Sequence, residues 1–283
     1  MKEMELRYRI VNVFAREGRL TGNPLCVFED GASLDGETMQ ALARQFNLSE
    51  TTFILPSEKA TARVRIFTPA YEMPFAGHPT LGTAHVVRSV KGGGDAVALE
   101  MRAGIIPVAA KGDRWTLQAG EPRSRALEAK RSELEEILGL EPGDVAEWPL
   151  WVNAGKEQLV VPLASAEAVR RARPRADAFS HLRSVDGHGM AFVFHDAGDA
   201  VGTVEARFFF PSGPAILEDP ATGSACANLG GWYTVVRPRT DVTRVVSQGE
   251  AVGRPSTLYL DVTHGAIHVG GNVVELGSGA VTL

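Results

Sequence analysis

The sequence has little cysteine, no dominant charge and no long apolar run, and each absence excludes a class of protein. Two cysteines among 283 residues lie in different halves of the chain, without a CxxC pattern or a neighbouring histidine cluster. Neither a disulfide framework nor a metal site is therefore expected. A net charge of −5, with basic and acidic residues interleaved, offers no basic patch for nucleic acid. The expected partner is a small molecule or another protein.

No stretch approaches the ~18 apolar residues that a membrane-spanning helix needs. The opening residues MKEMELRYRIVNVF also lack the apolar core of a secretory signal. We therefore expect no membrane association and a location in the reducing cytoplasm. What the chain does have is 44% hydrophobic residues and 30 glycines, a composition typical of a globular protein rich in turns.

Local patterns predict an alternation of strands and helices. RYRIVNVFA and LCVFE, separated by the turn-forming REGRLTGNP, indicate a β-hairpin. A helix is expected next, with Asp35 as its N-cap and Asn47 as its stop, because apolar residues recur between them at helical spacing. In the second half, Ser132 and Glu135 are spaced as the capping box of another helix.

Two nearly identical heptads stand 141 residues apart, about half of the chain: HPTLGTA from His78 and DPATGSA from Asp219. The longer stretches VRIFTPAYEMPFAGHPTLGTA and ARFFFPSGPAILEDPATGSA share an arginine-containing strand, a proline, a loop and the heptad. The repeat predicts a duplication, with similar domains at residues 1–119 and 120–283, separated near QAGEPRSR. The C-terminal strand is a candidate for crossing back to complete the first domain.

Each heptad predicts the start of a helix. Proline is tolerated at the first helical position and the residue before it is the N-cap position, so His78 and Asp219 are interpreted as caps. The small residues that follow leave N–H groups exposed at a positive helix end, which binds a carboxylate or a phosphate. If both ends face one cleft, the cleft suits an anionic substrate whose carbanion-like state needs stabilising. The alternative is that Asp219 is only a cap and His78 only a turn residue.

Glu50 lies in NLSETTFIL, where a helix is expected to end and an apolar, β-branched strand to begin. From the residues alone Glu50 is only a candidate: partial removal of its carboxylate from water there would raise its pKa and suit it to carrying protons. The residues alone leave open the alternative of a solvated glutamate at the end of a strand.

Five stretches carry a resemblance to a known family. NPLCVF, NLSETTFI, PFAGHPTLGTA, EDPATGSA and QGEAVGRPS, in this order over nearly the whole chain, resemble the PhzF-like phenazine-biosynthesis family. The resemblance implies an α/β (α+β) fold like that of diaminopimelate epimerase, with each sheet wrapped round a central helix and the active site between the domains. It also implies a homodimer that isomerises a small carboxylate-bearing molecule by a proton shift, without a cofactor, as with trans-2,3-dihydro-3-hydroxyanthranilate.

The matched motifs assign roles to individual residues. By resemblance, Glu50 would move the proton, and His78 and Asp219 would orient the substrate and assist, so these three are the candidate catalytic residues. The substrate's carboxylate and polar groups would be held by four further residues: Ser49, Gly77, Gly223 and Ser224.

Two other functions stay open. An epimerase or racemase of an amino or hydroxy acid would need two opposed proton carriers, and the epimerase relatives use a pair of thiols at the two helix starts. Neither heptad contains cysteine, and Cys26 and Cys226 are expected to be packed small residues. The other possibility is a non-catalytic protein that binds a small ligand or a partner.

Overall fold

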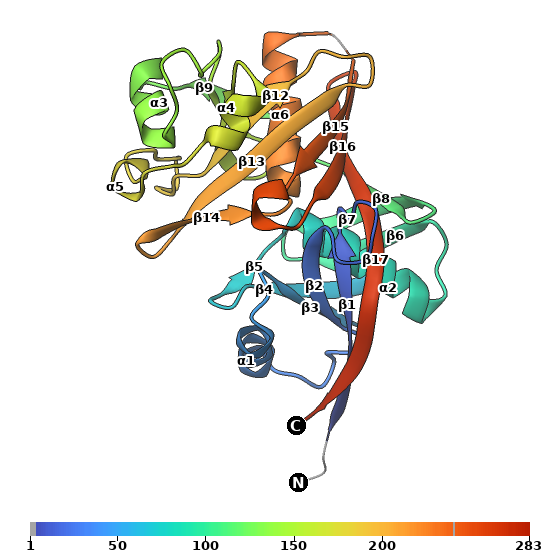
Figure 1. The fold of residues 1–283 in the computed structure, drawn as a ribbon. Helices are drawn as coiled ribbons and strands as arrows, with labels where there is room; N and C mark the ends of the chain where they lie inside the picture. The colour runs from blue at the N-terminus through green and yellow to red at the C-terminus, as the bar shows by residue number, and fades with distance from the viewer. Residues whose placement is uncertain (1–3, 240) are drawn as a thin grey trace. The chain divides into compact units, whose positions relative to one another are not determined.

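The computed structural model describes residues 4–239 and 241–283 (Figure 1). The chain divides into two compact units, one formed by the residues up to Gln118 together with Gly270–Leu283, and the other by Ala119–Val269. The long C-terminal strand β17 (Ala266–Thr282) therefore begins in the second unit and ends in the first.

The first unit consists mainly of strands, with helices α1 (Gly36–Phe46) and α2 (Gly77–Lys91). Its strands are, in chain order, β1 (Glu5–Val13), β2 (Asn23–Phe28), β3 (Thr51–Leu55), β4 (Ala62–Phe67), β5 (Glu72–Met73), β6 (Ala96–Met101), β7 (Gly104–Lys111) and β8 (Arg114–Gln118). The later part of β17 pairs antiparallel with β1, so the end of the chain completes this unit's sheet.

The second unit has the same character. Its strands are β9 (Arg123–Ala126), β10 (Leu150–Asn153), β11 (Glu157–Pro162), β12 (Ala191–Asp196), β13 (Thr203–Ser212), β14 (Ala215–Asp219), β15 (Val242–Gln248) and β16 (Ser256–Thr263). Its helices are α3 (Arg131–Leu138), α4 (Ala166–Arg171), α5 (Ala176–Phe179), α6 (Gly223–Val236) and the 3₁₀ turn η1 (Glu250–Val252). Among the helices of the described residues, none is both long and apolar enough to cross a membrane.

Both units pair their strands in one order. In the first, β1–β2 is antiparallel, β2–β3 parallel, β3–β4 and β4–β5 antiparallel, β4–β6 parallel and β6–β7 antiparallel. In the second, β10–β11 is antiparallel, β11–β12 parallel, β12–β13 and β13–β14 antiparallel, β13–β15 parallel and β15–β16 antiparallel. This shared topology confirms the predicted α/β fold of two similar domains.

A buried helix lies at the centre of each unit. Helix α2 contacts β1, β2, β3, β6 and β8, and α6 contacts β10, β11 and β16. Glycine permits these approaches: a Cβ atom on Gly82 of α2 would lie 2.7 Å from a methyl of Leu25, and one on Gly231 of α6 would lie 2.7 Å from a methyl of Val152. Any larger side chain at either glycine would force helix and sheet apart.

An arginine–glutamate pair closes the equivalent hairpin in each unit. Arg65 of β4 binds Glu72 of β5 through two nitrogens, at 2.8 and 2.9 Å, and its guanidinium lies 5.0 Å from the ring of Phe67. Arg207 of β13 binds Glu218 of β14 in the same way, at 3.1 and 2.6 Å. Its guanidinium lies 4.8 Å from the ring of Phe209. The duplication therefore extends to side-chain contacts.

Helix α1 has the expected limits. Asp35 is its N-cap and accepts a hydrogen bond from the Thr38 amide, and Asn47 ends it with a left-handed backbone. Met39 and Leu42 are buried in an apolar cluster with Phe28 and Phe53 of the sheet. Both predicted limits are confirmed because each depends on a short-range contact that the local sequence specifies.

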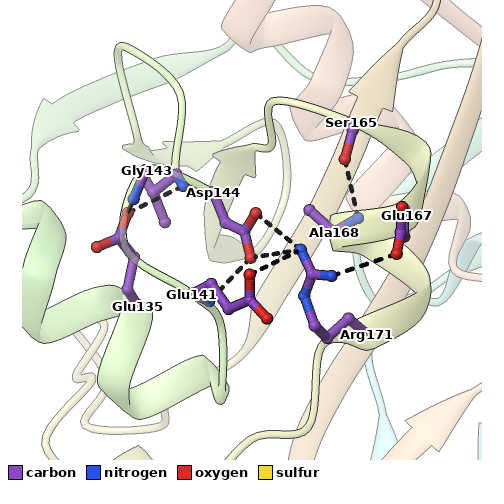
Figure 2. Close-up of polar contacts among 9 residues, drawn as sticks. Glu135, Glu141, Gly143, Asp144, Ser165, Glu167, Ala168 and Arg171 are labelled. Atoms are coloured by element: carbon purple, nitrogen blue, oxygen red, sulfur yellow. Dashed lines mark hydrogen bonds and ion pairs between the residues drawn. The ribbon is translucent and has the colours of Figure 1, made fainter.

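The predicted capping box at Ser132 and Glu135 is wrong. Helix α3 begins earlier, with Lys130 as N-cap, and the Glu133 carboxylate accepts from the Lys130 amide. Glu135 instead accepts hydrogen bonds from the amides of Gly143 and Val145, which holds the following loop (Figure 2). The loop that follows α3 binds the Glu135 carboxylate, and the spacing of Ser132 and Glu135 in the sequence does not indicate this contact.

Candidate active site

Glu50 lies at the mouth of β3, directly before Thr51, as the sequence predicts. Its side chain is 16% exposed. Burial raises the pKa of the Glu50 carboxyl to about 7, against a smaller opposing effect of a hydrogen bond from the Ser49 hydroxyl. Ser49 Oγ also lies 3.4 Å from Asn23 Oδ1, and its one proton can serve only one acceptor at a time. At neutral pH Glu50 can therefore both accept and release a proton.

His78 faces this carboxylate. Its Nε2 atom lies 3.4 Å from Glu50 Oε2, and its side chain is 7% exposed. Thr52, the second residue of β3, follows Glu50 by two positions. Thr52 and Thr83 of α2 share a buried hydrogen bond of 2.8 Å between their hydroxyls. Two side-chain contacts therefore join β3 and its preceding residue to α2: the Thr52–Thr83 hydrogen bond and the Glu50–His78 pair.

The start of α2 differs from the prediction. Ala76, and not His78, is the N-cap, and it supplies no side-chain cap. Gly77 is therefore the first helical residue and His78 the second. The interpretation of His78 as a cap is wrong because proline is tolerated throughout the first helical turn, whose N–H groups have no intrahelical partner, so Pro79 does not fix the first position.

Asp219 is not a cap either. It is the last residue of β14, where it pairs with Phe208 of β13, and the N-cap of α6 is Thr222. The Asp219 carboxylate accepts a hydrogen bond from the Thr222 hydroxyl, and the Asp219 carbonyl accepts one of 2.8 Å from Gln248 Nε2. The β13–β14 ladder holds Asp219 in extended conformation, which places Pro220 in a connection between strand and helix.

The two heptads therefore occupy different positions in their units. The caps Ala76 and Thr222 lie 146 positions apart, and the heptads 141. Met73 and Asp219 are each the last residue of the second hairpin strand, three residues before the cap. The structural counterpart of His78 is accordingly Ser224, the second residue of α6. The two units have the same fold, but the two heptads do not occupy equivalent positions in them.

Gly223 and Ser224 form the first turn of α6, which has no side-chain cap. Ser224 Oγ accepts a hydrogen bond of 2.9 Å from Gln158 of β11, whose own carbonyl oxygen accepts one of 2.7 Å from Asn228. Asn228 and Gln158 are both buried. No local pattern indicates either amide, because each stands inside an apolar element and acts only through contacts across the fold.

The structure thus brings the candidates together in two groups. Glu50 and His78 meet in the first unit, with Ser49 and Gly77 adjoining them in sequence. Asp219, Gly223 and Ser224 stand together at the β14–α6 connection of the second unit. Gln248, which contacts this connection, was missed by sequence reasoning although it begins the stretch QGEAVGRPS.

Residues 11–283 match the sequence profile of the PhzC–PhzF family, described as phenazine biosynthesis-like protein. The chain belongs to this family. An uncharacterized isomerase of Pasteurella multocida is 36% identical over 96% of this chain and 92% of its own length. The trans-2,3-dihydro-3-hydroxyanthranilate isomerase of Pseudomonas aeruginosa is 34% identical over 98% of this chain and 99% of its own. These relatives support assignment of the chain as an isomerase.

A solved structure shows the same fold. The crystal structure of a PhzF-family phenazine biosynthesis protein of Bacillus anthracis superposes with a TM-score of 0.87, covering 99% of this chain and 100% of that one at 24% identity. At this identity the likeness establishes the fold alone. The fold agrees with the expected epimerase-like arrangement of a sheet around a central helix in each unit.

Neither cysteine of this PhzC–PhzF protein stands at a helix start. Cys26 lies within β2 and Cys226 is the fourth residue of α6, and both side chains are fully buried. Burial raises the pKa of both thiols far above its usual range, so the thiolate needed for proton transfer is suppressed. The expectation that both are packed residues agrees with this burial.

Proposed function

We propose that this protein isomerises a small carboxylate-bearing molecule by a proton shift in which Glu50 is the acid–base group. The observation that carries the proposal is the Glu50 carboxyl itself, buried, with a pKa raised to about 7 and lying 3.4 Å from an imidazole nitrogen. A buried carboxyl that has no arginine or lysine paired with it among the described residues is costly to a fold. Retaining one at the mouth of a strand is typical of a site where a proton is moved.

The proton balance needs one group only. Ionised Glu50 would take a proton from a carbon of the substrate, and the electron pair of that C–H bond would move into a neighbouring unsaturated system. Protonated Glu50 would then deliver the proton to a second carbon, which regenerates the carboxylate. A pKa near neutrality favours both halves, because neither protonation state is strongly preferred.

The remaining candidates are proposed to bind and orient. His78 would hold the substrate against Glu50, and Asp219 would accept a hydrogen bond from a polar donor of the substrate. The uncapped first turns at Gly77 and at Gly223–Ser224 offer backbone N–H groups suited to a carboxylate. The homodimer and the cytoplasmic location expected from the sequence stay predictions.

An epimerase is the competing proposal, because it uses the same fold. It would need two proton carriers on opposite faces of one carbon. The two buried cysteines do not fit that role, and Glu50 with His78 supplies carriers on one side only within the first unit. A proton shift between two carbons is the reaction that this set of groups supports best.

The test is incubation in deuterated water with trans-2,3-dihydro-3-hydroxyanthranilate, followed by proton NMR, with proline and diaminopimelate offered in parallel. We expect a rearranged product that carries deuterium at the carbon receiving the proton, and no inversion of either amino acid. Deuterium at the α-carbon of an amino acid, with loss of optical activity, would replace the isomerase proposal with the epimerase.

A further inference from the structure

The hydroxyl of Thr222 is turned away from the helix that it caps. Thr222 is the N-cap of α6, yet its side chain accepts no hydrogen bond from the first turn. Its Oγ1 donates instead to the Asp219 carboxylate, and lies 3.1 Å from Gln248 Nε2, which donates to it. A hydroxyl has one proton, so a hydroxyl that accepts from Gln248 has that proton directed at Asp219.

Gln248 is the residue that fixes this direction. It ends β15, and its side chain is 1% exposed. Besides Thr222 Oγ1, its Nε2 donates to the Asp219 carbonyl at 2.8 Å, and its Oε1 accepts from the Thr222 amide at 3.3 Å. Exchanging the two amide atoms would set oxygen against a carbonyl and nitrogen against an N–H group. The partners therefore determine one orientation of the Gln248 amide.

The chain beyond Gln248 is fastened to the same connection. Gly249 has a φ of +84°, and a Cβ atom there would lie 2.5 Å from the Pro220 carbonyl and 2.2 Å from that of Arg254. Only glycine fits such a conformation at this approach. The stretch QGEAVGRPS thus brings a buried amide against the β14–α6 connection and keeps it there.

We propose that Thr222 and Gln248 are positioning residues of Asp219, which aim its carboxylate and stabilise its ionised form; this rests on the proposed role of Asp219 in binding substrate. A hydrogen bond donated to a carboxylate favours the charged state, and the amide of Gln248 prevents the donor from rotating away. Neither residue need touch the substrate. They hold the Asp219 carboxylate in one orientation before the substrate binds.

The first arm of the test needs no substrate. The carboxyl carbon of Asp219 is followed by ¹³C NMR in protein labelled with [γ-¹³C]aspartate, its signal being the one that disappears in Asp219→Asn. In Thr222→Val we expect this signal to titrate at higher pH than in the wild-type protein, and in Thr222→Ser close to it. Valine keeps the shape of threonine, and no side-chain cap is lost.

The matched control is Thr243→Val. Thr243 stands on β15 as Gln248 does, and its exposed hydroxyl donates at 3.1 Å to the Asp261 carboxylate. This variant should leave the Asp219 signal unchanged. An Asp219 signal that titrates identically in wild type and in Thr222→Val would overturn the proposal, whatever the enzyme's substrate proves to be.

The second arm measures turnover of trans-2,3-dihydro-3-hydroxyanthranilate. We expect Thr222→Val and Gln248→Leu to raise KM about tenfold or more with a smaller change in kcat, and Thr222→Ser to restore the wild-type KM. An unchanged KM beside a shifted Asp219 signal would contradict the part of the proposal that concerns substrate. A wild-type protein inactive on this probe would count against the proposed function, and the NMR arm would still decide the positioning role.

Discussion

Glu50 Oε2 lies 3.4 Å from His78 Nε2, and the two side chains are 16% and 7% exposed. The pair joins the mouth of β3 to the first turn of α2, and Thr52 and Thr83 join the same two elements one level further in. A carboxyl so placed is a stability cost when it is ionised, since burial is the largest influence on its pKa. The burial that makes ionised Glu50 destabilising is also what raises its pKa into the range useful for proton transfer.

The destabilisation by ionised Glu50 predicts that the stability gained by Glu50→Gln depends on pH. The ordinary glutamate pKa of 4.5 rises to about 7 on folding. Below the lower value the carboxyl is protonated in both states, so it imposes no penalty. As pH rises, the unfolded chain ionises first and folded stability falls until the pH passes the folded pKa. Glu50→Gln should therefore match the wild type near pH 4 and exceed its free energy of unfolding by about 3 kcal/mol above pH 7.

Urea denaturation across this range measures the effect. The matched control is Glu58→Gln, which changes an exposed glutamate a few residues away and should show no such divergence. A Glu50→Gln variant that gains nothing at pH 8 would mean that the carboxyl is well solvated or paired in the folded protein.

The hydroxyls of Thr52 and Thr83 should be strongly coupled. Thr83→Val leaves the Thr52 hydroxyl buried without its partner and should cost about 1–3 kcal/mol, and the double valine variant should cost less than the sum of the single changes. Thr51→Val is the control on the same strand, because the Thr51 hydroxyl is buried with no hydrogen-bond partner among the described residues; it should be neutral or stabilising. Additive losses at Thr52 and Thr83 would show that their hydrogen bond contributes nothing.

The two hairpin ion pairs should differ in strength. The side chains of Arg207 and Glu218 are 9% and 8% exposed, and those of Arg65 and Glu72 are 22% and 17% exposed. Arg207 also donates at 2.7 Å to the Ala172 carbonyl at the end of α4. Arg207→Met should cost about 3–5 kcal/mol, because it strands a buried carboxylate, and Arg65→Met distinctly less. Equal losses in denaturation experiments would refute this ranking.

The cysteines should be inert in the folded protein. Both thiols are fully buried, and burial raises the pKa of each. Cys26 and Cys226 should therefore react with a thiol reagent only after denaturation, and a double change to alanine should keep catalytic activity. Loss of activity in a double variant with native thermal stability would restore a thiol mechanism.

The sequence predicted best what depends on neighbours along the chain. The limits of α1 at Asp35 and Asn47 and the position of Glu50 directly before a strand follow from short local patterns, whereas the residues alone left the burial of Glu50 open. The heptads were matched in the wrong register, because a proline in the first turn does not say which turn position it holds. The helix caps Ala76 and Thr222, together with the strand end at Asp219, reveal that His78 corresponds to Ser224.

Other parts of the candidate site could not be read from the sequence at all. Gln248 reaches Asp219 and Thr222 from 26 positions or more along the chain, and Gln158 reaches Ser224 across 66. A glutamine in a strand ordinarily lies at the surface, and its distance in sequence from a helix start does not indicate a contact with that helix. What makes these amides important is the packing of β11 and β15 against the start of α6, which no local pattern specifies.

The measurement that tests the central claim most directly compares single-turnover rate with ligand affinity in Glu50→Gln. Glutamine keeps the shape of the side chain and removes its ability to take a proton. On trans-2,3-dihydro-3-hydroxyanthranilate, or another carboxylate that the wild-type protein isomerises, the rate should fall ~10²–10⁴-fold, with the dissociation constant nearly unchanged and Glu58→Gln fully active. A Glu50→Gln protein that turns over at the wild-type rate would show that Glu50 does not move the proton.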